Sequence, residues 1–222
     1  MPQTGALAYN PPPHPLDIVY LDATLLVLNK PSGLLSVPGR GEAKRDCLAT
    51  RVQEVFPEAL VVHRLDMETS GLMIMARTQD MHRRLSRMFE KRQVEKGYIA
   101  LVAGRLRRQS GVIDLPLICD WPNRPRQMVD LSLGKAARTR YRVMEFDPAA
   151  DTTRVELKPE TGRTHQLRVH MLALGHPIVG DSLYGNGDKP APSDRLRLHA
   201  SALSFCHPHT GEMLELGSPT PF

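Results

Sequence analysis

The sequence predicts a mixed α+β fold: a mostly antiparallel central sheet with flanking helices. Stretches that alternate apolar and polar residues, or that are rich in β-branched residues, outnumber stretches with helical periodicity. Their order along the chain is not the strict alternation of strand and helix that accompanies a parallel sheet. The 222 residues, of which 41% are hydrophobic and 24% charged, suit one compact domain.

The first sixteen residues are expected to form an extended arm. They contain the run Pro11–Pro13 and Pro15, and they show little periodicity. We therefore expect an arm over residues 1–16 and one folded domain over residues 17–222. No run of about 18 apolar residues exists, and the start lacks a basic segment followed by an apolar one. Neither a membrane span nor a signal peptide is predicted, and we expect a cytoplasmic location.

The first part of the domain is expected to contain two strands, a helix and a strand–loop–strand passage. The two strands lie at residues 18–20 and 25–29, around a short turn. Asp46 is expected to N-cap the helix. One face of this helix is apolar and consists of Leu48, Val52, Val55 and Phe56. Residues 60–76 hold the next two strands, with the turn residues Thr69–Gly71 between them.

A strongly basic helix is expected next, with Thr78 as its cap. Its inward positions are Met81, Leu85, Met88 and Phe89. Its outward or flanking positions are Arg83, Arg84, Arg87, Lys91 and Arg92. From Arg77 to Arg108 the chain has ten Lys or Arg against three acids, a local excess of +7 that exceeds the net charge of +5. This region is either a solvated basic face or a surface that follows nucleic-acid phosphates, and composition alone does not choose.

Strands dominate the second half of the domain. They are expected at residues 96–103, 112–118, 137–146, 155–158 and 196–205. Pro159 ends the fourth of these strands. A helix is expected to open at Thr164 and to stop at Gly175. Its apolar side consists of Leu167, Met171 and Leu174.

Several classes of enzyme are disfavoured by missing motifs. The chain has no Gly-x-x-x-x-Gly-Lys phosphate loop, no Gly-x-Gly-x-x-Gly, no His-Glu-x-x-His and no Gly-x-Ser-x-Gly. Cys47, Cys119 and Cys206 are too widely spaced for a zinc site or a disulfide framework, so we expect reduced thiols. His165, His170 and His176, spaced five and six residues apart, do not share a helical face. We expect no metal site.

Two dense polar strings are the candidates for chemistry. In the first, residues 62–71, Arg64 and Asp66 lie two positions apart, on the same side of an extended chain next to a turn. The simpler interpretation is that Asp66 only accepts N–H bonds within that turn. The second string, residues 158–170, offers Arg163 or Arg168 as the cationic partner that a buried carboxylate needs.

Seven segments of the chain, in order, carry a resemblance that covers residues from about Leu16 to the C-terminus. They are NKPSGLLSVPG (29–39), HRLD with TSG (63–71), KGY (96–98), GRTHQLRVH (162–170), GHPI (175–178), GD with YG (180–185) and LHA (198–200). Together they resemble the RluA family of RNA pseudouridine synthases. This resemblance implies the pseudouridine synthase catalytic fold over residues 17–222, and an isomerase that flips its target base and uses no cofactor or metal.

The segment DLPLICDWPNRP (114–125) resembles the RluA subgroup of that family. The resemblance implies two RNA partners: a uridine in 23S rRNA and one in the anticodon stem-loop of certain tRNAs. The same chemistry on a single rRNA or tRNA site is the alternative. Several relatives carry an N-terminal S4 RNA-binding domain, which sixteen residues cannot hold. We therefore expect a monomer whose RNA contacts all come from the catalytic domain.

The resemblance also implies roles for individual residues. Asp66 would be the catalytic carboxylate, acting either as a nucleophile at C1′ or as the base that takes the 2′ proton. Arg64 would occupy the stack that the flipped uridine vacates. The ring of Tyr98 would pack on the uracil, and the apolar Leu198 would line the pocket. Arg168 would be the partner that keeps Asp66 ionised. Arg83, Arg84, Arg87, Lys91 and Arg92 would bind RNA phosphates.

Arg163 and Arg168 can be ranked by helical geometry. Five residues apart on a helix, they point about 140° from each other, so only one of them readily faces the pocket. We predict Arg168 as the partner of Asp66 and expect Arg163 to meet backbone or phosphate. Two rival functions stay open at this point: a non-catalytic RNA-binding module, and a nuclease. The chain lacks the cluster of acids that a two-metal nuclease requires.

Overall fold

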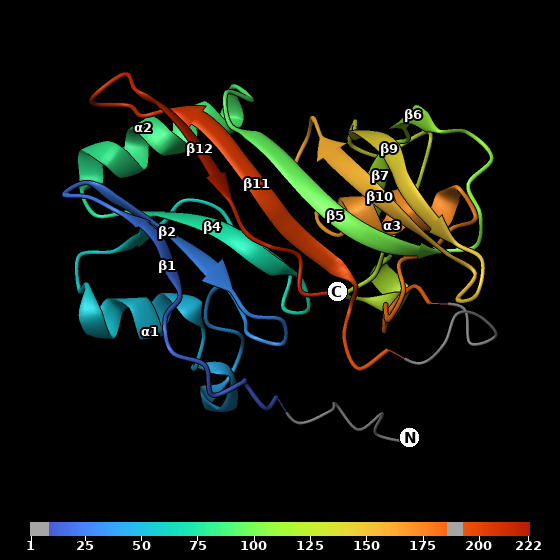
Figure 1. Cartoon of the computed structure of the whole chain (residues 1–222). Coiled ribbons are helices and arrows are strands. Elements are labelled where there is room, and N and C mark those ends of the chain that lie inside the picture. Colours follow the sequence, from blue (N-terminus) through green and yellow to red (C-terminus); the bar gives the residue numbers. More distant parts are fainter. Residues whose placement is uncertain (1–8, 186–192) are drawn as a thin grey trace.

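The fold is organised around one long, mixed sheet, seen in the computed structural model of Figure 1, which describes residues 9–185 and 193–222. Its strand order is β1-β2-β4-β11-β5-β10-β9-β6, with β3 added beside β4 and β12 beside β11. The strands are β1 (Ile18–Leu21), β2 (Leu25–Lys30), β3 (Leu60–Val61), β4 (Ser70–Ala76), β5 (Glu95–Ala103), β6 (Ser110–Asp114), β9 (Arg138–Asp147), β10 (Thr152–Pro159), β11 (Leu198–Cys206) and β12 (Met213–Gly217). Within the described chain, β4 and β11 form the one parallel pair.

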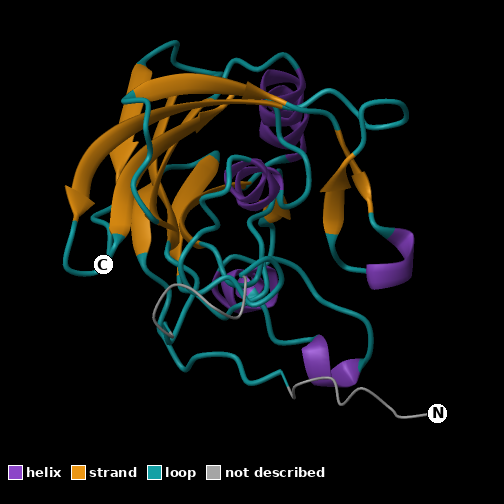
Figure 2. Ribbon diagram, turned by 90° about the vertical axis from the view of Figure 1, so that its right-hand side faces the viewer, coloured by secondary structure: helices purple, strands orange, loops and turns teal. Residues whose placement is uncertain are grey.

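Three α-helices and a small second sheet complete the described structure. The helices are α1 (Leu48–Val55), α2 (Gln79–Glu90) and α3 (Gln166–Ala173), and two short 3-10 turns are η1 (Glu42–Lys44) and η2 (Trp121–Asn123). Strands β7 (Leu117–Cys119) and β8 (Gln127–Val129) pair with each other. Figure 2 shows this two-stranded sheet standing to one side of the large sheet. It packs on α3 through a cluster that includes Leu117, Val169 and Tyr184.

The β2–β4 half of the sheet is buried on both faces. Leu26 and Leu28 of β2 face the core that contains α1, whereas Leu25 and Val27 face the core that contains α2. This alternation follows from the period of two along a strand. All seven residues of β4 are buried for the same reason. The pattern explains why these strands read as continuous apolar runs in the sequence.

The other half of the sheet is covered by α3. Ala100 and Val102 of β5 and Val155 and Leu157 of β10 form a core with the helix, which contributes Leu167 and Met171. Tyr98 of β5 packs against both this core and the core under α1. The middle strands β5 and β11 are therefore the place where the two halves meet.

The predicted fold class is confirmed, as are the basic helix and its Thr78 cap, which accepts a hydrogen bond from Met81 N at 3.1 Å. None of the described helices combines the length and the apolar character that crossing a membrane requires. The position of the β4–β11 pair was not predicted. Gly71, with φ of 112°, lies so close to β11 that a Cβ there would stand 2.3 Å from Ala200 O.

Several predicted boundaries were wrong. Cys47, not Asp46, caps α1, because the Asp46 carboxylate instead pairs with Arg51 at 2.7 Å. Val55, placed on the apolar face, is 61% exposed at the end of the helix. The single strand predicted at 112–118 is two strands, β6 and β7, which belong to different sheets.

The start of α3 also differs from the prediction. The helix begins at Gln166, and its N-cap is His165 rather than Thr164. Strand β10 includes Pro159 as its last residue, one position beyond the predicted end. The sequence analysis did not identify β8 or β12, which are short and partly exposed and so show weak alternation.

Candidate active site

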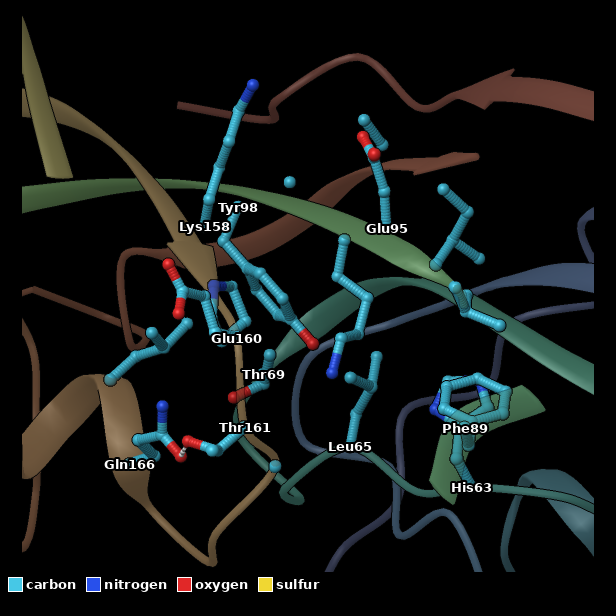
Figure 3. Close-up of a pocket in the computed structure, with 18 of the residues that line it drawn as sticks. His63, Leu65, Thr69, Phe89, Glu95, Tyr98, Lys158, Glu160, Thr161 and Gln166 are labelled. Atoms are coloured by element: carbon cyan, nitrogen blue, oxygen red, sulfur yellow. Dashed lines mark hydrogen bonds between the residues drawn. The ribbon is translucent and has the colours of Figure 1, made fainter. Parts of the chain in front are cut away.

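A cleft of about 1300 Å³ lies over the middle of the large sheet. Its walls come from both halves of the sheet: the segment before β4, strand β5, the end of β10 with the segment that leads into α3, and parts of β11 and β12. Figure 3 shows Tyr98 projecting from β5 into this space, with its hydroxyl end toward Thr69 and Leu65. Asp66, Arg168 and Leu198 line the same cleft.

Asp66 lies on a turn that does not use its carboxylate. The turn is closed by Asp66 O, which accepts a hydrogen bond from Thr69 N at 3.2 Å. The simpler interpretation, in which the side chain accepts N–H bonds within the turn, therefore does not describe this structure. On the other side of Leu65, the Ser36 hydroxyl donates to Leu65 O at 2.7 Å and accepts from Leu65 N at 3.1 Å. The turn is held by other groups, and the carboxylate is left for the cleft.

Lys30 also holds this turn, a role that was not predicted from the sequence. Its side chain is fully buried, and its ammonium donates to Pro31 O at 2.9 Å, Leu34 O at 2.7 Å and Met67 O at 3.0 Å. Burial lowers the pKa of Lys30 to about 7, and the charge of Asp66 opposes that shift. Three carbonyl acceptors match the three hydrogens of an ammonium group.

Arg168 is buried and lies beside three carboxylates, of which that of Asp181 is also buried. It donates from Nε to Asp181 Oδ2 at 2.7 Å and from Nη2 to Asp181 Oδ1 at 2.6 Å, and Nη2 also reaches Glu68 at 3.2 Å. Its Nη1 lies 3.7 Å from Asp66 Oδ2. Burial alone would lower the pKa of Arg168, but Asp181, Asp66 and Glu68 reverse this effect and raise it.

Arg168 was therefore predicted from the sequence, but its closest partner, Asp181, was not. Asp181 has no side-chain exposure, and it also accepts hydrogen bonds from Leu183 N and Tyr184 N at 2.9 and 3.0 Å. The segment that carries it was part of the family resemblance, but its spacing from Arg168 gives no sign of contact. Arg163 also lines the cleft, but its Nε donates to Ala136 O at 3.1 Å.

Tyr98 and Leu198 form the apolar side of the cleft. They lie on neighbouring strands, because Leu198 pairs with Ala100 and Ala200 pairs with Tyr98 across β5 and β11. Burial, with a smaller contribution from the Asp66 charge, raises the pKa of Tyr98. The phenol therefore stays neutral at physiological pH and presents an uncharged ring to the space beside Asp66.

The predicted RNA-binding residues fall into two groups. Arg64 and Arg92 line the cleft and are exposed at its rim. Four others are exposed on or just after α2 but do not line the cleft: Arg83, Arg84, Arg87 and Lys91. Asp80 pairs with Arg84 at 2.6 Å and with Arg83 at 3.6 Å. The structure thus brings two of the six basic residues to the candidate site.

His165 and Tyr184 are further members of the site that the sequence analysis did not select. The His165 side chain is 9% exposed, and its Nε2 lies 3.9 Å from Asp66 Oδ1. Tyr184 is 2% exposed, and its hydroxyl contacts His165 Nδ1 at 2.8 Å. In the part of the chain that the structure describes, no three His, Cys, Asp or Glu side chains gather as they would around a metal ion.

The site presents the Asp66 carboxylate, which makes no hydrogen bond within its own turn. This carboxylate lies between the Arg168 guanidinium and the His165 imidazole, in the cleft that the Tyr98 ring also lines. Such an arrangement can hold a planar base against Tyr98 and bring a carboxylate to the sugar attached to it. Leu198 excludes water from one side, and the rim arginines can meet phosphate. This suits chemistry on a nucleotide that enters the cleft from a longer polyanion.

Comparison with known proteins also points to RNA as the substrate. Residues 24–173 match the family described as RNA pseudouridylate synthase. The dual-specificity RNA pseudouridine synthase RluA of Salmonella typhi is 52% identical over 219 residues, which cover 98% of this chain and 100% of that protein. The protein of the same name from Escherichia coli (strain K12) is 52% identical with the same coverage. The solved structure of human RNA pseudouridylate synthase domain containing 1 is 33% identical with a TM-score of 0.77, and the match covers 99% of this chain and 87% of that chain.

Proposed function

The chain belongs to the RNA pseudouridylate synthase family and is an isomerase that acts on RNA, and from this premise we propose that Asp66 is the group on which its reaction depends. Pseudouridine forms when the N1–C1′ bond of uridine breaks, the uracil turns, and C5 bonds to C1′. The product is an isomer of the substrate, so no electrons are gained or lost overall. One correctly placed carboxylate can assist every one of these steps.

The placement of the Asp66 carboxylate is the observation that carries this proposal. Its turn is closed by backbone atoms, and its two oxygens face Arg168 at 3.7 Å and His165 at 3.9 Å. Burial disfavours a charged carboxylate, and an adjacent guanidinium offsets that cost. We therefore propose Arg168 as the cationic partner of the Asp66 carboxylate when RNA covers the cleft.

The remaining residues act on the uridine as a whole. A uridine in a stem or stacked in a loop cannot reach Asp66 unless it is flipped out, at a cost of a few kcal/mol. Arg64 at the rim would fill the vacated stack with its planar guanidinium. Tyr98 would pack on the flipped uracil, and Leu198 would exclude water beside it.

Two routes begin at Asp66. In one, Oδ attacks C1′ and the uracil leaves with the N1–C1′ electron pair; C5 then bonds to C1′ as the Oδ–C1′ bond breaks and the carboxylate is released. In the other, the carboxylate takes the 2′ proton as the base leaves, giving a glycal, and returns the proton when C5 adds to C1′. Both routes end with loss of the C5 proton, which restores the aromatic-like uracil ring. Both require an ionised Asp66.

We extend the proposal to the substrates. The relatives from Salmonella typhi and Escherichia coli are named dual-specificity enzymes, and they match 98% of this chain. We propose that this chain likewise modifies one uridine in 23S rRNA and one in the anticodon stem-loop of certain tRNAs. We also propose that residues 17–222 form a monomeric catalytic domain and that the enzyme works in the cytoplasm. The arm expected over residues 1–16 lies partly outside the described residues, which begin at residue 9.

Asp66→Asn tests the catalytic assignment. The change keeps the size of the side chain and removes its charge, so pseudouridine formation should vanish while RNA binding persists. Glu68→Gln is the matched control, because Glu68 lies on the same turn and also contacts Arg168. Single-turnover pseudouridine formation on the purified variants is the measurement. A substantial fraction of the parent rate in Asp66→Asn would refute the assignment.

An isolated anticodon stem-loop tests the substrate assignment. Without a requirement for distant contacts, a short loop refolded on the protein surface should suffice as substrate. Carbodiimide primer extension on rRNA and tRNA from a deletion strain, with and without the restored gene, would locate each modified uridine. If only assembled ribosomal subunits are modified, the dual specificity is wrong although the family assignment stands.

A further inference from the structure

His165 has an uncommon backbone conformation for its position. It is the N-cap of α3, with φ of 53° and ψ of 19°, in the left-handed region that favours glycine. Its side chain makes no capping hydrogen bond. In the segment just before the helix, Arg163 N donates a hydrogen bond to Gln166 Oε1 at 3.0 Å. The imidazole is thereby free to enter the cleft, and this strained conformation needs an explanation.

Tyr184 determines which nitrogen of His165 carries the hydrogen. The Tyr184 hydroxyl accepts a hydrogen bond from Gln127 N at 2.6 Å, and it lies 2.8 Å from His165 Nδ1. A hydroxyl has one hydrogen, and in the described structure Nδ1 is the acceptor within its reach. Because Tyr184 is 2% exposed, leaving that hydrogen unpaired would be costly. The hydroxyl therefore donates to Nδ1, and the ring hydrogen of neutral His165 is on Nε2.

The Nε2–H group faces the carboxylate of Asp66. Nε2 lies 3.9 Å from Oδ1, while Arg168 Nη1 lies 3.7 Å from Oδ2. Each carboxylate oxygen thus lies near a different N–H group. Both distances are longer than a hydrogen bond, as is common for catalytic groups before substrate binds.

We propose that His165 is a positioning residue for Asp66: Tyr184 holds it as the Nε2–H tautomer, and that N–H orients Oδ1 while Arg168 orients Oδ2. This inference rests on Asp66 being the reacting group. It explains why a histidine is held in a left-handed conformation there, since the ring must reach both Tyr184 and Asp66. It also links the β7–β8 sheet to the reaction, because Gln127 of β8 fixes the Tyr184 hydroxyl.

The Tyr184 contact fixes the position of the ring hydrogen only while the imidazole is neutral, since a protonated ring carries hydrogen on both nitrogens. Burial lowers the pKa of His165, opposed by the charges of Asp66 and Asp181 and supported by those of Arg168 and Arg64. Tyr184 acts in the same direction as burial, because a proton on Nδ1 would displace the hydroxyl hydrogen. The ring therefore stays uncharged at neutral pH. It becomes protonated only as the pH falls below the ordinary histidine range.

Tyr184→Phe removes the hydroxyl that fixes the tautomer, together with the acceptor of Gln127 N. The phenyl ring keeps the contacts with Arg168 and Arg126, whose guanidinium carbons lie 5.2 and 5.4 Å from the ring centre. We expect the single-turnover rate to fall about tenfold, the cost of one hydrogen bond to a charged group, with RNA affinity unchanged. The deficit relative to the parent should shrink as the pH falls through the range in which the imidazole is protonated, because a protonated ring carries hydrogen on Nε2 whichever tautomer it had when neutral. A parent-like rate, or a deficit that does not change with pH, would overturn the proposal.

Two substitutions of His165 separate positioning from a structural role. In His165→Gln the amide N can reach the place of Nε2, whereas in His165→Asn it reaches only the place of Nδ1. Asn tolerates the left-handed conformation better than Gln, so a structural role predicts that Asn is the better replacement. Positioning predicts the opposite order for the rate, with Gln retaining about ten times the activity of Asn.

Urea midpoints of both variants report folding separately from rate. If Asn is the more active variant, the proposal is refuted. Asp66→Asn, measured in the same series, keeps the two proposals distinct. An active Asp66→Asn refutes the role of Asp66 itself. An inactive Asp66→Asn beside fully active His165 and Tyr184 variants refutes only the inference made here.

Discussion

Arg168 and the arginines of α2 have the same guanidinium group in opposite surroundings. The Arg168 side chain is 2% exposed and lies among Asp66, Glu68 and Asp181. Arg83 and Arg84 are 73% and 52% exposed and share Asp80. Water and salt screen the second group, so its pairs add little to stability, whereas a broken buried pair leaves a charge stranded. The exposed arginines of α2 can therefore attract RNA, whereas the buried Arg168 fixes the geometry of the groups around it.

Replacing Arg168 should have the largest effect. Arg168→Ala strands three carboxylates, so we expect loss of activity together with about 3 to 5 kcal/mol of unfolding free energy. Arg163→Ala is the matched control on the same segment, since its Nε meets only a backbone carbonyl among the described residues. Single-turnover rates and urea midpoints should be measured side by side. If Arg163→Ala lowers both the single-turnover rate and the urea midpoint more than Arg168→Ala does, the contrast between buried and exposed arginines is refuted.

Asp181→Asn should come second. The amide keeps the shape of the carboxylate but cannot form the charged two-point pair with Arg168 at 2.6 and 2.7 Å. We expect a loss of about 1 to 3 kcal/mol of unfolding free energy and a lower rate, because Arg168 is then free to turn away from Asp66. Equilibrium urea unfolding measures the first quantity. A stability equal to that of the parent would mean that Glu68 and Asp66 suffice to hold Arg168.

The exposed group should respond through binding rather than folding. In an Arg84→Ala, Arg87→Ala double variant we expect the slope of log affinity against log salt to fall by about two, because each arginine would neutralise one RNA phosphate. Binding should weaken evenly across RNA sequences, and the urea midpoint should stay close to that of the parent. Fluorescence titrations at several salt concentrations provide the slope. An unchanged slope would show that this face is only solvated.

Asp80→Asn should have the smallest effect, and of opposite sign. Asp80 holds Arg83, Arg84 and His209 at the start of α2. Removing its charge releases the arginines for phosphate, so RNA affinity at low salt should rise by a small factor. The rate of the bound complex should not change. A weaker affinity would indicate that Asp80 arranges these arginines for RNA instead of competing with it.

The sequence predicted most of the fold because its strong elements are locally encoded. The basic helix carries its cap, its apolar stripe and its charged face within fourteen consecutive residues, from Thr78 to Lys91. The predicted cap of α1 was wrong because Asp46 is engaged by Arg51, five positions away, and the Arg51 guanidinium is in turn held by Pro12 O at 2.9 Å, 39 positions away. Strands β8 and β12 were missed because each is stabilised by its partner rather than by its own pattern.

The site divides in the same way. Asp66, Tyr98, Arg168 and Leu198 were named because they belong to segments similar to a known family, and all four line one cleft. Asp181, His165 and Tyr184 belong to similar segments too, but their importance lies in contacts between residues far apart in sequence. No spacing rule places Asp181 beside Arg168 or the Tyr184 hydroxyl beside His165.

The parallel pairing of β4 with β11 has a consequence for the order in which the protein is made. Ser70 and His199, which face each other across this pair, are 129 positions apart, and β11 lies between β4 and β5 in the sheet. During synthesis the residues of the Asp66 turn are therefore made long before Arg168, Asp181 and Leu198. The place between β4 and β5 is filled only once β11 has been translated, so we expect a shorter chain to lack a complete pocket. Enzyme activity should thus be acquired only after β11 is available, in one long-range step.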